Sequence, residues 1–443
     1  MFPSARRILP TAQAFRKNRI PGQLVVQLSD HCNARCPQCG MRKTERFPRS
    51  KLPVDRVKRI IDAAAERGFQ AISFTGGEPL LWLDEVTELI RHAGRAGIPY
   101  IRTGTNGFIF MGSEKPGFRR RMERIAETLA GTPLRNFWIS IDSADPDVHE
   151  RMRGFPGVAA GIRKALPFFH ERGLYPSANL GINRNMAGDG PDRRVGGADP
   201  EAFFRFYRSA FRRFYSAVID MGFTMVNCCY PMSIDAADGD REGLSPIYAA
   251  TSPDAVVKYT PAEKGLLFRA LMETIPEFRS RIRIFTPRIS LYALWAEYSG
   301  NGNGRTIGAY PCRGGIDFFF IDARDGNAYP CGYRGADNFG PMEAMDPALI
   351  RPNGNGSEGG CRACDWECFR DPSELMGPLL EGIRRPGAVL TKMIKDAEYR
   401  RLWLADLRYY RACDFFDGRT PMKPDKLIFP ATDSPVRHKT SSS

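Results

Sequence analysis

The sequence has no uninterrupted apolar run of about 18–20 residues, the length that a membrane-spanning helix needs. Its first 22 residues are basic but lack the apolar core of about 7–15 residues that secretory signals contain. Both absences argue against a membrane-spanning or secreted chain. Eleven cysteines stand mostly in tight clusters, which without a secretory signal favour metal ligation in a reducing compartment. We therefore expect the protein in the cytoplasm.

The chain has fewer acidic residues than basic ones. It contains 50 Asp and Glu and 64 Lys and Arg, which gives a formal net charge of +14. Such a balance is compatible with an anionic partner: a nucleic acid, a membrane surface or a phosphorylated substrate. No recognisable nucleic-acid-binding module accompanies the basic residues, which are spread along the chain. We interpret most of them as solvated helix faces and expect no specific nucleic-acid partner. The aromatic and basic segment Tyr399–Arg411 leaves a peripheral membrane or lipid contact open.

Apolar runs typical of buried strands alternate with amphipathic helical patterns six times in the first 230 residues. This alternation implies parallel strands with right-handed crossovers, as in a doubly wound sheet or part of a (β/α) barrel. In either architecture the functional residues gather at the carboxyl ends of the strands. The predicted strands are Gln23–Leu28, Ala71–Phe74, Tyr100–Arg102, Phe137–Asp142, Ala178–Ile182 and Phe223–Asn227. The predicted helices between them cover residues 54–67, 84–96, 117–129, 158–172 and 201–221.

Composition divides the chain into four parts. A basic N-terminal extension covers residues 1–20, and the alternating α/β unit covers residues 21–300. The Gly-Asn-Gly-Asn-Gly run at residues 300–304 is typical of a flexible connector and marks a domain boundary. A smaller, cysteine-rich unit follows at residues 305–425, and the polar tail at residues 432–443 is predicted to be disordered.

Three cysteines, Cys32, Cys36 and Cys39, follow the first predicted strand with the spacing CxxxCxxC. Three thiolates can bind three irons of a [4Fe–4S] cluster and leave the fourth iron open. A structural zinc site would need a fourth ligand, and His92 is the only candidate in the hundred residues that follow. The pattern therefore favours an iron–sulfur cluster.

A second motif, Thr75-Gly76-Gly77-Glu78-Pro79, follows the second predicted strand. Its glycines allow the backbone to approach a ligand closely, and Glu78 offers a carboxylate to an ammonium group. In this order and at this distance, the two motifs resemble the radical S-adenosylmethionine (SAM) superfamily over about residues 20–230. One residue departs from that family, because Gln38 stands before the third cysteine where an aromatic residue is usual.

The resemblance implies a partial (β/α)6 TIM-like barrel, to which a small C-terminal cysteine-rich α+β module is attached. It also implies that Cys32, Cys36 and Cys39 hold a [4Fe–4S] cluster whose open iron binds SAM. Reduction, from a donor such as flavodoxin or ferredoxin, would cleave SAM to a 5′-deoxyadenosyl radical that abstracts a substrate hydrogen. The cofactor-binding candidates are Gly76, Gly77, Glu78, Thr105, Ser140, Asp142 and Asn179. A simple turn at Thr105 and Asn106, and a strand-end polar residue at Asn179, stay open as alternatives.

A second group of cysteines lies beyond the connector: Cys312, Cys331, Cys361, Cys364, Cys368 and Cys413. Residues 316–321 and 327–329 flank Asp325-Gly326, a strong hairpin signal that brings Cys312 and Cys331 to the same end.

The order of these cysteines resembles the auxiliary-cluster modules of radical SAM enzymes, known as SPASM and twitch. The spacing CX13GX4C opens the module as in that family, whereas the later CX2CX3C run is shorter than in a SPASM module. The resemblance implies at least one auxiliary [4Fe–4S] cluster, held by Cys312 and Cys331 with two of Cys361, Cys364 and Cys368. A zinc site on the same sulfurs, or two clusters with a ligand other than cysteine, stay open.

Cys228 and Cys229 end the sixth predicted strand. One of these thiols could point into the barrel and donate a hydrogen atom to a product radical, as in radical epimerases. Buried cysteine is also an ordinary small core residue, so packing is the alternative role.

The sequence therefore predicts a radical SAM oxidoreductase whose auxiliary cluster accepts the substrate electron. The expected substrate is a small metabolite, such as a sugar, a cofactor precursor or a lipid. Three alternatives stay open: maturation of a ribosomal peptide, redox-neutral epimerisation or C–C bond formation, and a non-catalytic iron–sulfur or zinc protein.

Overall fold

The computed structural model describes residues 19–20, 22–40, 49–188, 199–231, 244–247, 252, 254–299, 310–345 and 364–428. Its strands form one sheet of nine, in the order β7-β6-β5-β4-β3-β2-β1-β8-β9. The strands are β1 (Gln23–Ser29), β2 (Ala71–Gly76), β3 (Tyr100–Thr105), β4 (Leu134–Ser140), β5 (Ser177–Gly181), β6 (Met225–Cys229), β7 (Arg283–Ile284), β8 (Phe318–Ile321) and β9 (Ala328–Tyr329). The predicted extension, connector and tail lie outside the described residues, apart from residues 19–20.

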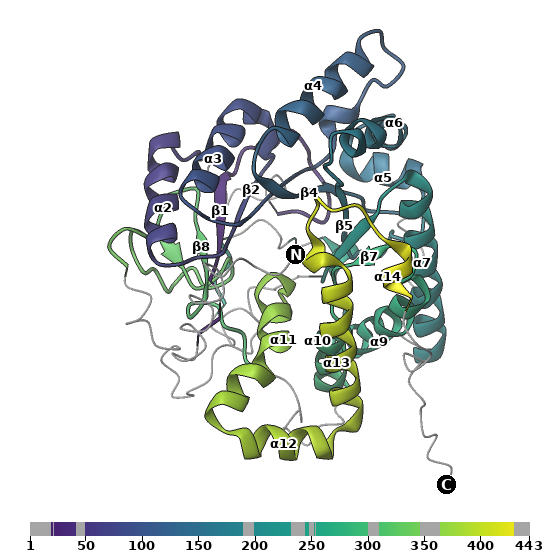
Figure 1. The fold of residues 1–443 in the computed structure, drawn as a ribbon. Helices are drawn as coiled ribbons and strands as arrows, with labels where there is room; N and C mark the ends of the chain where they lie inside the picture. Colours follow the sequence, from purple (N-terminus) through teal and green to yellow (C-terminus); the bar gives the residue numbers. More distant parts are fainter. Residues whose placement is uncertain are drawn as a thin grey trace.

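Strands β1 to β7 are all parallel, and each is hydrogen-bonded to the next one along the chain. Helices connect them and cover the outer face of the sheet (Figure 1). The connecting helices are α2 (Val54–Glu66), α3 (Leu83–Arg95), α4 (Phe118–Ala130), α5 (Pro146–Arg153), α6 (Val158–Glu171), α7 (Pro200–Met221) and α9 (Pro261–Phe278). The predicted partial (β/α)6 barrel is therefore confirmed, with β7 added at its far edge.

Period-two alternation along the strands separates a helix-facing side from an inner side. Val26, Phe74 and Phe137 are fully buried on the helix side, where they meet the apolar stripes of the connecting helices. Helix α2 shows the matching pattern, because its buried residues recur at helical spacing. The other side of the strands is consequently free to carry polar side chains.

The predicted hairpin around Asp325 and Gly326 is confirmed as the antiparallel pair of β8 and β9. Strand β8 also pairs in parallel with β1, so that Gln23 lies opposite Phe318. The cysteine-rich hairpin therefore extends the sheet of the barrel past β1. Sequence reasoning did not foresee this pairing.

The remaining helices form an extension beside the carboxyl ends of the strands, seen at the bottom of Figure 1. They are α10 (Arg288–Tyr298), α11 (Glu367–Arg384), α12 (Pro386–Lys395) and α13 (Ala397–Ala412). The single turn α14 (Pro424–Leu427) follows them in the chain but lies beside α7 in Figure 1, outside the extension. Helix α13 returns from α12 toward the barrel and packs on α10. None of the helices in the described residues has the length and apolar character to cross a bilayer.

Candidate active site

A cavity of about 270 Å³ lies at the carboxyl ends of β1 to β6 and is closed by the start of α11. Along each strand, the residues that line the cavity mostly alternate with residues that face the helices, because successive side chains of a strand point to opposite sides. From the strands it is lined by Val25, Ser73, Thr75, Gly76, Arg102, Gly104, Thr105, Trp138, Ser140, Asn179, Asn227 and Cys229. The predicted cofactor residues Gly76, Gly77, Glu78, Thr105, Ser140 and Asn179 all belong to the lining, whereas Asp142 does not.

The loop after β1 carries Cys32, Cys36 and Cys39, of which Cys36 is buried and the other two are partly buried. The Cys39 amide donates to the Cys36 carbonyl at 3.1 Å, which makes the second half of the loop a tight turn. The Ala34 amide donates to Cys32 Sγ at 3.4 Å. Burial raises the pKa of the Cys36 thiol to about 12, although a nearby arginine opposes this.

The glycine loop after β2 is held against the start of this cysteine loop. The Gly77 amide donates to the Ser29 carbonyl at 2.8 Å, and the Glu78 amide donates to the His31 carbonyl at 2.9 Å. A Cβ on Gly77 would lie 1.8 Å from the His31 carbonyl oxygen, and one on Gly76 would lie 2.1 Å from that of Ser29. Only glycine therefore permits this contact between the two motifs.

Glu78 connects the ends of β2 and β3. One carboxylate oxygen accepts from the Leu80 amide at 3.0 Å, and the other accepts from the Asn106 amide at 2.6 Å. Asn106 in turn donates through its side chain to Cys32 Sγ at 3.6 Å and to Asn33 at 2.8 Å. Burial raises the pKa of Glu78 to about 7 against these amide contacts. Glu78 thus links the cysteine loop to the cavity wall.

Among the described residues, no three Cys, His, Asp or Glu side chains converge where one metal ion could bind. Whether the loop suits an iron–sulfur cluster is therefore judged from the types of ligand and hydrogen-bond donor that it offers. Three thiols on one short loop supply the ligands, and Asn106 and Arg153 direct N–H groups at two of the sulfurs. Donors of this kind stabilise thiolates and tune iron–sulfur sites.

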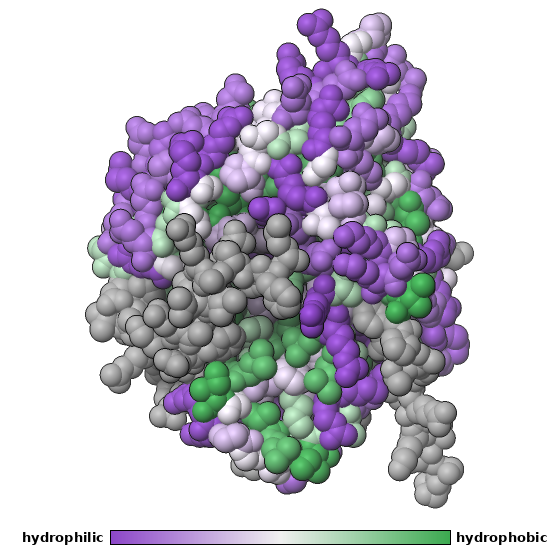
Figure 2. Space-filling view, viewed as in Figure 1, coloured by the Kyte–Doolittle hydropathy of each residue, from purple (hydrophilic) through white to green (hydrophobic). Residues whose placement is uncertain are grey.

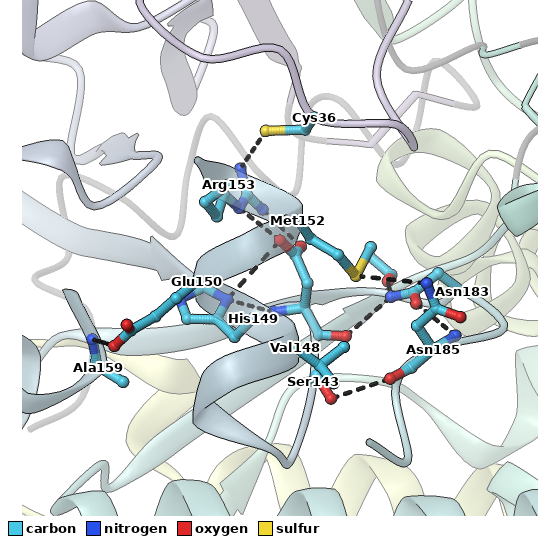
Figure 3. Close-up of polar contacts among 12 residues, drawn as sticks. Cys36, Ser143, Val148, His149, Glu150, Met152, Arg153, Ala159, Asn183 and Asn185 are labelled. Atoms are coloured by element: carbon cyan, nitrogen blue, oxygen red, sulfur yellow. Dashed lines mark hydrogen bonds and ion pairs between the residues drawn. The ribbon is translucent and has the colours of Figure 1, made fainter. Parts of the chain in front are cut away.

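Arg153 lies between the cysteine loop and a buried carboxylate (Figure 3). Its guanidinium contacts both oxygens of Asp142, at 2.5 and 2.6 Å, and its Nη1 lies 3.7 Å from Cys36 Sγ. His149 Nδ1 accepts from the Asp142 amide at 3.1 Å. Burial by itself would raise the pKa of Asp142, but Arg153 and His149 outweigh it and lower the pKa to about 2. Asp142 is therefore an anionic partner that orients Arg153.

The two neighbouring cysteines of β6 lie on opposite sides of the strand. Cys228 is fully buried and its sulfur lies 3.7 Å from the Tyr215 hydroxyl on the helix side. Cys229 lines the cavity, where Asn179 Nδ2 donates to its sulfur at 3.4 Å. Asn227 donates to the Asn179 side-chain oxygen at 3.1 Å and fixes that amide. Cys229 is thus the thiol of this pair that faces the cavity.

The C-terminal cysteines gather beside the hairpin. Cys331 is buried in an apolar cluster with Phe318, Tyr333 and Phe369, and three other cysteines pack against that cluster. These are Cys312, Cys364 and Cys368. Cys361 lies outside the described residues, and Cys413 is buried in a different cluster with Tyr409 and Phe416.

The start of α11 forms the far wall of the cavity and brings Trp366, Glu367 and Cys368 into it. The Cys368 thiol donates to Glu367 at 3.5 Å. Burial raises the pKa of Glu367, and it raises that of Asp371 on the next turn further, with a contribution from Glu367. The Tyr230 hydroxyl donates to Asp371 at 3.1 Å. Cys368 therefore belongs both to the C-terminal cysteine group and to the cavity wall.

Sequence reasoning missed three residues of this site. Arg153 is the last residue of α5. The sequence marks the start of this helix with Asp145-Pro146 and its end with Gly154. Arg102 stands inside a buried strand, donates to the Ser73 hydroxyl at 2.8 Å and lines the cavity. No local signal marks Glu367, because its place depends on how α11 docks against the barrel.

Residues 26–183 match the model of the radical SAM superfamily, which confirms the predicted resemblance. The AdoMet-dependent heme synthase of Methanosarcina barkeri is 30% identical over 137 residues, 31% of this chain and 36% of that protein. The GTP 3′,8-cyclase of Desulforamulus reducens is 31% identical over 181 residues, 39% of this chain and 51% of that protein. The match thus spans only about a third to a half of these relatives.

One similar solved structure is Streptococcus suis SuiB bound to the precursor peptide SuiA. It is 16% identical, with a TM-score of 0.44 over 73% of this chain and 63% of SuiB.

Proposed function

We propose that this protein, which carries a radical SAM domain, is an enzyme that cleaves SAM reductively and removes a hydrogen atom from a substrate in the cavity. One observation carries the proposal: the glycine loop is held by backbone hydrogen bonds on the start of the three-cysteine loop and also lines the cavity. Both loops stand at the carboxyl ends of parallel strands, where α/β enzymes place their chemistry.

Cys32, Cys36 and Cys39 would hold a [4Fe–4S] cluster, and the surrounding residues would position SAM. When bound, the cluster and SAM together supply a 5′-deoxyadenosyl radical. Gly76, Gly77 and Glu78 present backbone groups and a carboxylate to the methionyl ammonium. Ser140 lines the cavity, as does Arg153, whose guanidinium is the local cation for the methionyl carboxylate.

Cys312 and Cys331 would hold an auxiliary cluster together with two of Cys361, Cys364 and Cys368. Cys331 belongs to one apolar cluster, Cys312, Cys364 and Cys368 pack against it, and Cys368 also lines the cavity. This site would take the electron that a substrate radical loses, while the carboxylate of Glu367 stands in the same wall to receive a proton. The proposed net reaction is therefore a two-electron oxidation.

The substrate that suits this cavity is a small metabolite. The cavity measures about 270 Å³ and is lined by polar groups such as Arg102, Asn179 and Asn227. Ligand pockets usually measure about 300–1,000 Å³, so the space is small for a site that must admit SAM and a substrate together. So limited a space favours a small substrate, such as a sugar, a cofactor precursor or a lipid, and a ribosomal peptide is the alternative.

We expect anaerobically reconstituted protein to contain about eight irons per chain and, with dithionite and SAM, to release 5′-deoxyadenosine. The triple variant Cys32→Ala/Cys36→Ala/Cys39→Ala should retain about four irons and release none. Iron and sulfide analysis and chromatography of the nucleoside measure both results. Bound zinc without nucleoside release would contradict the proposal and indicate a structural metal protein.

A redox-neutral reaction is a second candidate, favoured by the thiol of Cys229 in the cavity wall. If the product is an oxidised metabolite, Cys229→Ala should still form it in step with 5′-deoxyadenosine. If Cys229 donates a hydrogen atom to a product radical, this variant should cleave SAM without releasing product. Cys228→Ala is the matched control, since its sulfur lies on the helix side of the same strand and should not affect coupling.

A further inference from the structure

The outer end of the helical extension exposes a group of large aliphatic side chains. Leu379 and Ile383 on α11 are 37% and 54% exposed, and Leu390 and Ile394 on α12 are 62% and 63% exposed. Each pair is four residues apart and so shares one helix face. Figure 2 shows hydrophobic surface gathered at the end of the molecule where Figure 1 places α12. We call these four residues the apolar end patch.

The patch differs from scattered surface leucines because its exposed side chains lie together at one end of the molecule. Of the eight large hydrophobic side chains that are exposed in the described residues, four belong to α11 and α12. Contiguous exposed aliphatic surface of this kind marks a site of interaction with a partner or a membrane.

Basic residues outnumber acidic ones around the patch. Arg384, Arg385 and Lys395 are all exposed at its edge. The neighbouring carboxylates are engaged elsewhere, because Glu381 accepts from the Tyr310 hydroxyl at 2.6 Å and Asp396 accepts from the Tyr399 amide at 2.8 Å. A partner that covers the patch must therefore be compatible with an edge of net positive charge.

We propose that the apolar end patch is a membrane-surface site that binds anionic bilayers. Helix α12 would lie in the plane of the interface, with Leu390 and Ile394 among the lipid head groups and the arginines on lipid phosphates. A second copy of the chain is the weaker candidate, because a two-fold interface through this patch would oppose Arg384 and Arg385 of both copies.

We place the proposed membrane contact on this patch rather than on the segment Tyr399–Arg411, for which the sequence left such a contact open. Tyr399 and Tyr409 in α13 are fully buried, and Trp403 and Tyr410 are partly buried, so few of the aromatic side chains of this segment are available to a membrane. The patch lies on α11 and α12, the two helices that precede α13 in the chain. Helix α11 runs from the cavity wall at Glu367 to Arg384, a length of about 27 Å at about 1.5 Å per residue. Changes at the patch should therefore leave SAM cleavage intact.

Flotation of the full-length reconstituted protein with vesicles tests the proposal. We expect binding to phosphatidylcholine vesicles that contain phosphatidylglycerol, little binding to pure phosphatidylcholine, and release at high salt. Leu390→Asn/Ile394→Asn should weaken binding at least about tenfold, because two aliphatic side chains no longer enter the interface. Arg384→Gln/Arg385→Gln should weaken it about fivefold per charge removed.

Ile428→Asn is the matched control, since Ile428 is 69% exposed but lies outside the extension, and it should bind like the wild type. Unchanged 5′-deoxyadenosine release in each variant would show that the fold is intact. The proposal is wrong if phosphatidylglycerol vesicles do not bind, or if both double variants bind as the wild type does. Light scattering that shows a dimer, abolished by Leu390→Asn/Ile394→Asn without any vesicle binding, would overturn it in favour of self-association.

Discussion

Gly77→Ala is expected to lower 5′-deoxyadenosine release at least about 100-fold. The new Cβ would lie 1.8 Å from the His31 carbonyl oxygen and 2.3 Å from its carbonyl carbon, and both atoms belong to rigid backbone. The clash can be relieved only if the glycine loop separates from the chain that leads into Cys32. Displacements of about 1 Å at a reacting centre can cost about 100-fold in rate. Nucleoside release per bound iron, measured after reconstitution, checks this result.

Gly382→Ala is the matched control for this substitution. Gly382 lies in α11, and a Cβ there would meet no atom within 4 Å. We expect full activity and a gain of about 0.5–1 kcal/mol in the free energy of unfolding, because alanine favours the helix. Normal SAM cleavage by Gly77→Ala would show that the two motifs do not depend on the contact that the structure places between them.

Local patterns were sufficient to predict the parts of the site that depend on one strand and the loop after it. The cysteine loop after β1 and the glycine loop after β2 both stand where the apolar runs end. Strand β6 begins at Met225, two residues later than predicted, and it includes both Cys228 and Cys229. Alternation alone then places the two thiols on opposite sides, but it does not say which side faces the cavity. Packing against α7 decides that.

Contacts between distant segments could not be predicted in the same way. Strand β8 pairs with β1 across almost 300 residues of sequence, and α11 brings Glu367 and Cys368 into the cavity. Neither contact leaves a periodic signal in the chain. Arg153 is a different case, because Asp145-Pro146 and Gly154 are ordinary start and stop signals for the short helix that carries it. Its partner Asp142 was predicted as a cofactor contact, whereas the structure places it against Arg153, outside the cavity lining.

Asp406→Ala is expected to destabilise the attachment of the helical extension to the barrel by about 3–5 kcal/mol. Asp406 on α13 is fully buried and accepts from Arg279 at the end of α9 and from the Ile289 amide in α10 at 2.8 Å. Arg279 is only 2% exposed and stacks 4.1 Å from the Tyr409 ring. Removing the carboxylate takes a close counter-charge away from a buried cation, which typically costs that much. The midpoint of thermal unfolding should fall accordingly.

Two further variants separate this cause from a general loss of packing. Arg279→Met/Asp406→Leu removes both charges and should recover most of the lost stability, because replacing a buried ion pair with apolar groups is often neutral. Glu114→Ala breaks an exposed ion pair with Lys164 and should leave the unfolding midpoint unchanged. A double variant as unstable as Asp406→Ala would show that the shape of this contact, rather than its charge, holds α13 on the barrel. Since α11 and α13 belong to the same extension, Asp406→Ala should also loosen the cavity wall at Glu367 and lower SAM cleavage before the barrel itself unfolds.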